Sequence, residues 1–109
     1  MIQTTVRLER PEGVILLRGI AVRIEHIEYG APASMMLHAD LAGARPYDLF
    51  ALYTLGGMPS IPIQRRDVLY DELNTDPETG QLAKYRVVAP VETFDNDHQE
   101  MLAERVVGG

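Results

Sequence analysis

The residues best suited to binding a metal ion gather near the C-terminus: Asp95, Asp97, His98 and Glu100. Carboxylate oxygens that lie close together hold hard cations, and an imidazole nitrogen can join them for a softer ion. The competing interpretation is a turn, because Asp and Asn side chains accept hydrogen bonds from nearby backbone. In an extended strand only His98 and Glu100 would share a face. The sequence therefore predicts a turn at the start of the last strand and no metal site.

A second acidic group, Asn74, Asp76 and Glu78, has the alternate spacing that begins a calcium-binding loop. The match then fails, because Pro77 interrupts the loop and Gly80 falls one position late. No glutamate occupies the closing position. We expect a solvated hairpin turn here.

Groups for nucleophilic or acid-base catalysis are scarce. The chain has no cysteine and only two serines, Ser34 and Ser60, neither with a visible base and orienting group. His26 and His38 likewise have no orienting partner in the sequence. The adjacent carboxylates Asp71-Glu72 would point to opposite faces of a strand and could not act as a pair. We therefore predict that the chain has no catalytic residues, requires no cofactor and is not an enzyme.

The basic residues include one doublet, Arg65-Arg66. The chain carries 10 basic and 16 acidic residues, a formal net charge of −6. This balance argues against uniform affinity for nucleic acid, which needs a basic patch. We expect the doublet to form surface or inter-subunit ion pairs, and a nucleic-acid contact is the alternative.

The elements that position these groups have the periodicity of strands. Thr4–Glu9 alternates between apolar and charged residues, and Pro11-Glu12-Gly13 is a turn sequence. In Val14–Tyr29 the alternation slips by one residue, which predicts a β-bulge near His26. Further strands are expected over Tyr47–Leu55, Val68–Leu73, Lys84–Ala89, Val91–Phe94 and His98–Val107. The fold class is mostly β: a small antiparallel β-barrel or sandwich with one long inserted loop, forming a single domain over residues 1–109.

The strand expected over Tyr47–Leu55 is apolar on both faces. Phe50 and Leu52 form one face, opposite a row that runs from Tyr47 to Leu55. A parallel sheet would cover both faces with helices, but the chain has too few helical segments for that. We therefore expect the core to cover one face and a neighbouring subunit the other, with a loop of the same chain as the alternative cover. Phe50, Leu52, Arg65 and Arg66 are the predicted subunit interface.

The segment from Gly30 to Pro46 carries little charge and is rich in Ala, Gly and Met. Gly and Pro at its ends favour a long loop. A short helix is the alternative, with Ser34 as N-cap and Leu37 and Leu41 one turn apart.

The C-terminal half of the chain resembles a known family. Its segments are Arg65-Arg66-Asp67-Val68-Leu69, Lys84-Tyr85-Arg86-Val87-Val88-Ala89-Pro90, Glu92-Thr93-Phe94, His98-Gln99-Glu100-Met101 and Ala103-Glu104-Arg105-Val106. This pattern resembles the head-closure (stopper) and head-tail adaptor proteins of long-tailed bacteriophages. In that group an Asp-aliphatic strand leads through a short polar hairpin into a Tyr-x-Val strand, and a bent crossing then leads to the final strand. The N-terminal half fits the same pattern more loosely.

The resemblance implies a small β-barrel repeated as a homo-oligomeric ring at the virion neck, assembled in the host cytoplasm between portal-adaptor and tail proteins. A long loop would point into the channel and gate the double-stranded DNA, which passes without specific binding. Carried over by position, the channel-loop residues are Gly30, Pro32, Met35, Met36, Leu37, His38, Asp40 and Pro46. No membrane is expected, because the apolar runs, such as Val14–Leu17, are too short to span one. The alternative function is a small β-barrel that binds an oligonucleotide or ligand.

Overall fold

The computed structural model describes residues 2–11, 13–27, 49–88, 91–95 and 97–106, and these contain seven strands and no helix. The strands are β1 (Ile2–Arg10), β2 (Val14–His26), β3 (Leu49–Thr54), β4 (Val68–Thr75), β5 (Leu82–Val87), β6 (Glu92–Phe94) and β7 (His98–Val106). Among the described residues, no helix is long and apolar enough to cross a membrane. Each expected strand is confirmed over its described residues, with ends that differ by a few positions.

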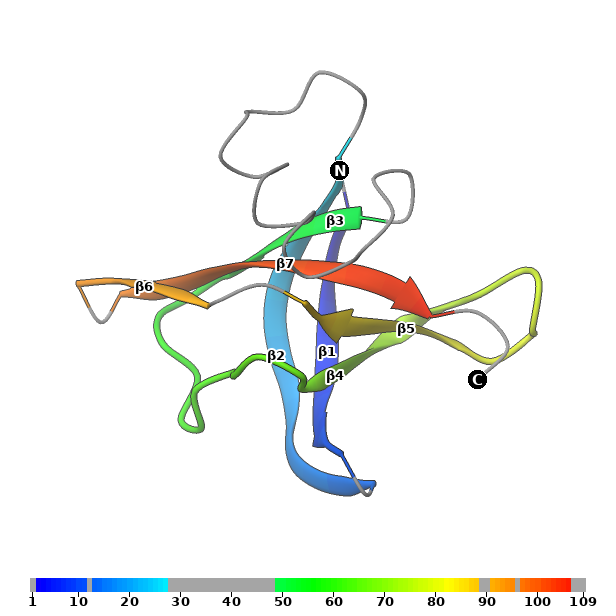
Figure 1. Cartoon of the computed structure of the whole chain (residues 1–109), viewed down its shortest axis with the longest axis horizontal. Helices are drawn as coiled ribbons and strands as arrows, with labels where there is room; N and C mark the ends of the chain where they lie inside the picture. The colour runs from blue at the N-terminus through cyan, green and yellow to red at the C-terminus, as the bar shows by residue number, and fades with distance from the viewer. Residues whose placement is uncertain (1, 12, 28–48, 89–90, 96, 107–109) are drawn as a thin grey trace.

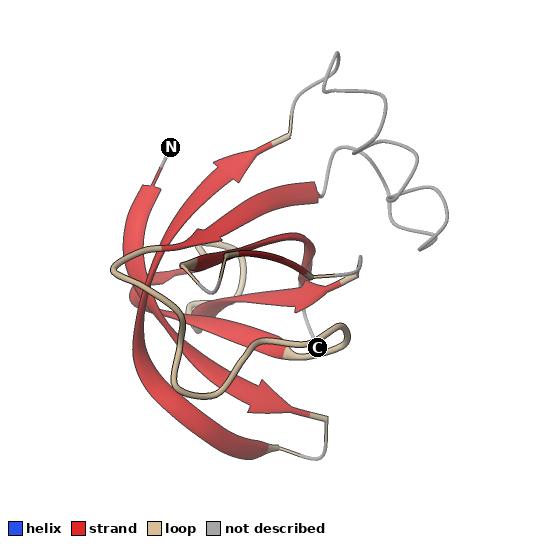
Figure 2. Ribbon diagram, turned by 90° about the vertical axis from the view of Figure 1, so that its left-hand side faces the viewer, coloured by secondary structure: helices blue, strands red, loops and turns tan. Residues whose placement is uncertain are grey.

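All seven strands belong to one antiparallel sheet with the order β3-β2-β1-β4-β5-β7-β6. Pairing of β3 with β7 closes β1–β5 and β7 into a six-stranded barrel, and β6 adds to the free edge of β7 (Figures 1 and 2). The expected mostly-β fold is thus an antiparallel barrel with one extra strand.

The β1–β2 hairpin follows directly from the sequence alternation. Val6 and Leu8 are fully buried, while Arg7 and Glu9 lie on the other face and form an ion pair at 2.7 Å. Gly13 closes the turn with φ of 81°, and its N–H donates to the Arg10 carbonyl at 3.1 Å. A residue without Cβ is favoured at such a positive φ.

The bulge in β2 is real, but it lies elsewhere than the sequence predicts. Val6 pairs with Ile20, whereas Leu8 pairs with Leu17, so β2 carries an extra residue around Gly19. Gly19 has φ of 70°, as a bulge glycine does. A second shift follows Leu8, and the two bend β2 around the barrel (Figure 1).

The prediction of a bulge near His26 is wrong. His26 pairs with Phe50 in unbroken register, and the Ile27 N–H continues it by donating to the Leu49 carbonyl at 3.0 Å. The one-residue shift in the alternation of apolar residues has another cause. Ile24 belongs to the barrel core, whereas the buried Ile27 lies on the opposite face of the strand. The slip therefore marks a change in which face is covered, not an inserted residue.

Strand β3 is buried on both faces within the single chain. Leu49 and Ala51 on one face are buried, as are Leu52 and Thr54 on the other. Leu52 is 0% exposed and belongs to the core cluster. No uncovered apolar face of β3 therefore remains for a neighbouring subunit, and the assignment of Leu52 to a subunit interface is wrong.

Phe50, the other aromatic or aliphatic residue of the predicted interface, also packs against the core of its own chain. It is half-buried and packs against the core cluster. Its ring lies 5.0 Å from that of His26 and 5.1 Å, edge-on, from that of Tyr85. The physical reason for the error at Leu52 is barrel closure: side chains that face inward are enclosed by strands from all sides, so no second layer is required.

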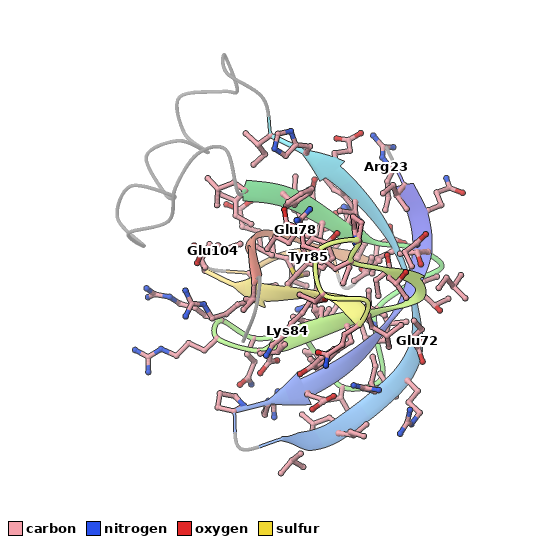
Figure 3. The ribbon with its side chains drawn as sticks, turned by 90° about the vertical axis from the view of Figure 1, so that its right-hand side faces the viewer. Arg23, Glu72, Glu78, Lys84, Tyr85 and Glu104 are labelled. Carbon is pink, nitrogen blue, oxygen red and sulfur yellow. The ribbon has the colours of Figure 1, made fainter. Side chains whose placement is uncertain are left out.

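Tyr85 carries a titratable group into this core (Figure 3). Burial, followed by the charge of Asp71, raises the pKa of its phenol above the ordinary value of 10.0. The folded chain thus holds this proton more tightly than the unfolded chain does. Its contribution to stability is complete below about pH 10 and is lost as the pH rises through the folded-state pKa.

Replacing Tyr85 with Phe should therefore make the alkaline loss of stability shallower while keeping the ring contacts. We expect urea unfolding at about pH 9 and about pH 11 to show a smaller drop for Tyr85→Phe than for the wild type. An equal drop in both proteins would mean that Tyr85 does not contribute to the alkaline transition.

Candidate functional site

The arginine doublet occupies a tight turn at the entrance to β4. The Asp67 N–H donates to the Gln64 carbonyl at 3.1 Å, so Arg65 and Arg66 are the two central turn residues. Arg66 has φ of 78°. In a turn that requires positive φ at its third position Gly is the usual residue, and a larger side chain there is strained. Such strain persists only where the surroundings hold the backbone in place.

Asp67 supplies part of that support from inside the protein. Its side chain is 2% exposed; one carboxylate oxygen accepts the Gln64 N–H at 2.8 Å and the other the Arg10 Nε–H at 3.2 Å. The backbone on either side is paired with the end of β5. Arg66 donates to the Val87 carbonyl, and Val87 donates to the Asp67 carbonyl, both at 2.9 Å.

Gln99, on β7, holds the segment that leads into the turn. Its side chain is 2% exposed, its Oε1 accepts the Ile63 N–H at 2.9 Å, and its Nε2 donates to the Ile63 carbonyl at 3.1 Å. The amide thus pairs with Ile63 as a neighbouring strand would. The Gln99 N–H in turn donates to the Thr54 hydroxyl at 2.8 Å. Asp67 and Gln99 together fix the path of the loop between β3 and β4.

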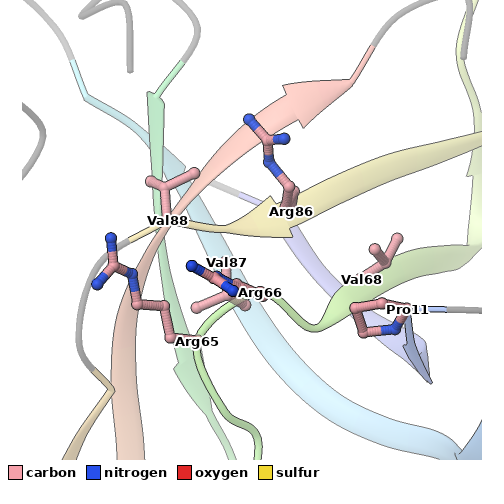
Figure 4. Close-up of a pocket in the computed structure, with 7 residues that line it drawn as sticks. All are labelled: Pro11, Arg65, Arg66, Val68, Arg86, Val87 and Val88. Atoms are coloured by element: carbon pink, nitrogen blue, oxygen red, sulfur yellow. The ribbon is translucent and has the colours of Figure 1, made fainter. Parts of the chain in front are cut away.

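The turn borders an open pocket of about 530 Å³ (Figure 4). Three arginines line it together with apolar side chains: Arg65, Arg66, Arg86, Pro11, Val68, Val87 and Val88. Arg86 is already paired with Glu104 on β7 at 2.6 Å. In the part of the chain that the structure describes, Arg65 and Arg66 are exposed and have no ion-pair partner.

The chemistry of this pocket, which we call the arginine pocket, is binding and not catalysis. Guanidinium groups stay protonated and present planar sets of donors that match carboxylates and phosphates. The valines and Pro11 add apolar surface beside them. The pocket therefore suits an anionic group attached to an apolar one.

The strain at Arg66 gives a direct test of the turn geometry. Arg66→Gly should be more stable than Arg65→Gly by about 1 kcal/mol, because only position 66 needs positive φ. The two variants lose the same charge from neighbouring positions, so each controls for the other. Chemical denaturation of both measures the difference, and equal stabilities would contradict the turn geometry.

The acidic group near the C-terminus forms the turn that the sequence predicts. The Asp97 N–H donates to the Phe94 carbonyl at 2.7 Å, and Asp95 has φ of 49°. His98 Nδ1 lies 3.2 Å from Asp97 and its Nε2 lies 3.5 Å from Glu100. Within the described ranges, no three His, Asp or Glu side chains are arranged to hold a metal ion.

The Asn74–Gly80 connection also forms a turn, but Asp76 is buried, not solvated. It is 3% exposed; its Oδ1 accepts the Glu78 N–H at 2.9 Å and its carbonyl accepts the Gly80 N–H at 2.8 Å. Its Oδ2 accepts no hydrogen bond in the described structure and faces Arg105 Nε at 3.6 Å. Asp76 thus organises the β4–β5 hairpin.

Asp71 and Glu72 point to opposite faces, as expected. Asp71 is 1% exposed and accepts hydrogen bonds from the Thr4 hydroxyl at 2.6 Å, the Leu73 N–H at 3.0 Å and the Asn74 side-chain amide at 2.9 Å. Glu72 lies at the edge of the barrel (Figure 3) and accepts the Gly19 N–H at 2.9 Å. The buried carboxylate has a structural role.

The structure separates the residues predicted to act together. Phe50 and Leu52 are inside the barrel, and Arg65 and Arg66 are on its surface. The channel-loop residues lie outside the described residues: Gly30, Pro32, Met35, Met36, Leu37, His38, Asp40 and Pro46. Sequence reasoning missed Asp67 and Gln99 as supports and Arg86 as part of the pocket. Comparisons of the chain with protein-family models, with curated proteins and with solved structures find no match.

Proposed function

We propose that the chain is a structural protein that assembles into a homo-oligomeric ring at the neck of a bacteriophage virion, between portal-adaptor and tail proteins. The observation that carries the proposal is a pair of arginines, Arg65 and Arg66, that have no ion-pair partner among the described residues and stand on a strained turn supported from inside the protein. The resemblance of the C-terminal half to head-closure proteins supplies the biological setting. The segment from Gly30 to Pro46 would gate the channel for double-stranded DNA.

The charge of the chain favours another copy as the partner of these arginines. At a net charge of −6, each copy offers far more carboxylates than cations. A rigid cationic site on an acidic protein attracts an acidic surface and rejects a basic one. The remaining acidic surface of a ring would repel the phosphates of DNA in its channel and would ease passage of the duplex.

Two measurements test the ring. Native mass measurement and negative-stain images of the purified chain, alone and with the portal-adaptor complex encoded beside it, should show a closed ring in at least one condition. Virions purified from the same phage should contain the chain in several copies. Its absence from virions, or a gene that lies away from portal and tail genes, would refute the neck assignment.

The arginine pocket favours one second candidate, a barrel that binds an oligonucleotide or another anionic ligand. Three arginines around apolar side chains could receive a phosphate and a base together. Fluorescence titration with single-stranded DNA at low salt separates the candidates. Submicromolar binding that Arg65→Glu/Arg66→Glu abolishes would favour the binding module over the ring.

A further inference from the structure

The β6–β7 hairpin extends away from the barrel (Figure 1). It carries an exposed aromatic residue, Phe94. Phe94 is 39% exposed, and its ring stacks on that of His98 at 5.0 Å with an interplanar angle of 9°. The turn is tight, because the Asp97 N–H donates a hydrogen bond to the Phe94 carbonyl. The hairpin therefore presents an apolar ring on a short, hydrogen-bonded support.

Three carboxylates lie close to Phe94 in the sequence of this hairpin. Glu92, Asp95 and Asp97 are exposed, and the Asp97 side chain is 79% exposed. Across the described ranges, none of the three is paired with an arginine or lysine. We call Glu92–Phe94 with Asp95 and Asp97 the acidic knob. It combines an apolar group with anionic groups, the combination that suits the arginine pocket.

We propose, on the basis of the assembly function above, that the acidic knob of one copy docks in the arginine pocket of the next. Phe94 would contact the apolar side chains of the pocket, and Glu92 and Asp97 would pair with Arg65 and Arg66. Aromatic and arginine side chains dominate the energetics of protein interfaces, and bidentate pairing adds orientation.

The two halves belong to different surfaces of one chain. The pocket lies between the entrance to β4 and the end of β5, and the knob lies beyond the edge of the barrel at β6. Among the described residues of the chain, the pocket and the knob form no ion pair with each other. A contact between unlike surfaces of identical copies is head-to-tail, and it closes into a ring when the rotation between copies fits.

The absence of cysteine from the chain allows a clean trapping experiment. Gln64→Cys marks the pocket turn and Thr93→Cys marks the knob; both positions are exposed, and neither side chain is among those proposed to form the contact. When equal amounts of the two single variants are mixed with a short bismaleimide, we expect the Gln64–Thr93 heterodimer to exceed the yield of random pairing, in which the heterodimer already outnumbers each homodimer. Thr75→Cys, exposed at the end of β4, replaces Thr93→Cys as the control and should give no excess. A heterodimer yield no higher than that of random pairing would overturn the proposal.

Charge reversal in the trapped pair then tests the contact itself. Arg65→Glu/Arg66→Glu in the pocket partner should lower the heterodimer yield at least about tenfold, as loss of a central charge pair does. Glu92→Lys/Asp97→Lys in the knob partner should restore it, since the two reversals recreate opposite charges. A heterodimer yield that charge reversal in the pocket leaves unchanged, or that the second reversal in the knob does not restore, would refute the docking. Circular dichroism of each variant separates loss of contact from loss of fold.

The outcome is separable from that of the ring. A trapped head-to-tail pair in a protein whose images show open chains would sustain the docking and refute the ring. A ring that forms equally well in the charge-reversed variants would sustain the ring and refute the docking.

Discussion

Leu52→Ala should lower the free energy of unfolding by about 3 kcal/mol, within the range of about 2–5 kcal/mol found when a buried leucine is truncated. Leu52 is 0% exposed and packs in the core of the barrel, where two sheet neighbours, β2 and β7, fix its strand. The lost methyl groups would leave a cavity that a closed barrel cannot collapse easily. Urea unfolding of the two proteins, followed by circular dichroism, measures the difference.

Leu73→Ala is the matched control, because Leu73 is 69% exposed near the end of β4. Its change should stay within about 0.5 kcal/mol. The effect at Leu52 should not depend on protein concentration, since the core lies within one chain. A Leu52→Ala protein of normal stability that fails only to self-associate would reinstate Leu52 as an interface residue.

The sequence predicts the strands and their inward faces well. Alternation in β1 identifies Val6 and Leu8 as buried, because a strand with one covered face repeats every second residue. The same rule misleads at β3, where both faces are apolar. Composition shows that both faces are covered but not which part of the molecule covers them. Local pattern cannot distinguish burial within the chain from burial by another chain.

The error at His26 has the same origin. The alternation of apolar residues shows which face of a strand is covered, but it does not show the hydrogen-bond register. Because the covered face changes at Ile27, the sequence there looks like that of a bulge. The actual bulge at Gly19 leaves only a glycine as its local signal. Register depends on the partner strand, which a single segment does not specify.

At the candidate site, the sequence reveals the charges but not their support. Arg65-Arg66 is visible as a doublet, yet the need for positive φ at Arg66 is hidden because no glycine stands there. Asp67 and Gln99 are residue types usually found on the surface, and here both are 2% exposed. Gln99 lies 36 residues from its partner Ile63. Only tertiary structure brings such partners together.

Gln99→Met should lower the free energy of unfolding by about 2–4 kcal/mol, because it leaves two buried backbone groups of Ile63 without partners. Met has nearly the volume of Gln, so packing changes little and the cost arises from the lost hydrogen bonds. Unfolding measurements give the total, and hydrogen exchange at the Ile63 amide should accelerate more than exchange in β1.

Gln81→Met is the control for this change, since Gln81 is exposed after the β4–β5 turn. The consequence for function follows from position. Ile63 directly precedes the turn that carries Arg65 and Arg66, so a loosened Ile63 should also release the strained turn. Gln99→Met should therefore weaken capture of the acidic knob, although Gln99 touches neither arginine. If Gln99→Met still captured the acidic knob in full while its Ile63 amide exchanged rapidly, Asp67 alone would be sufficient to order the turn.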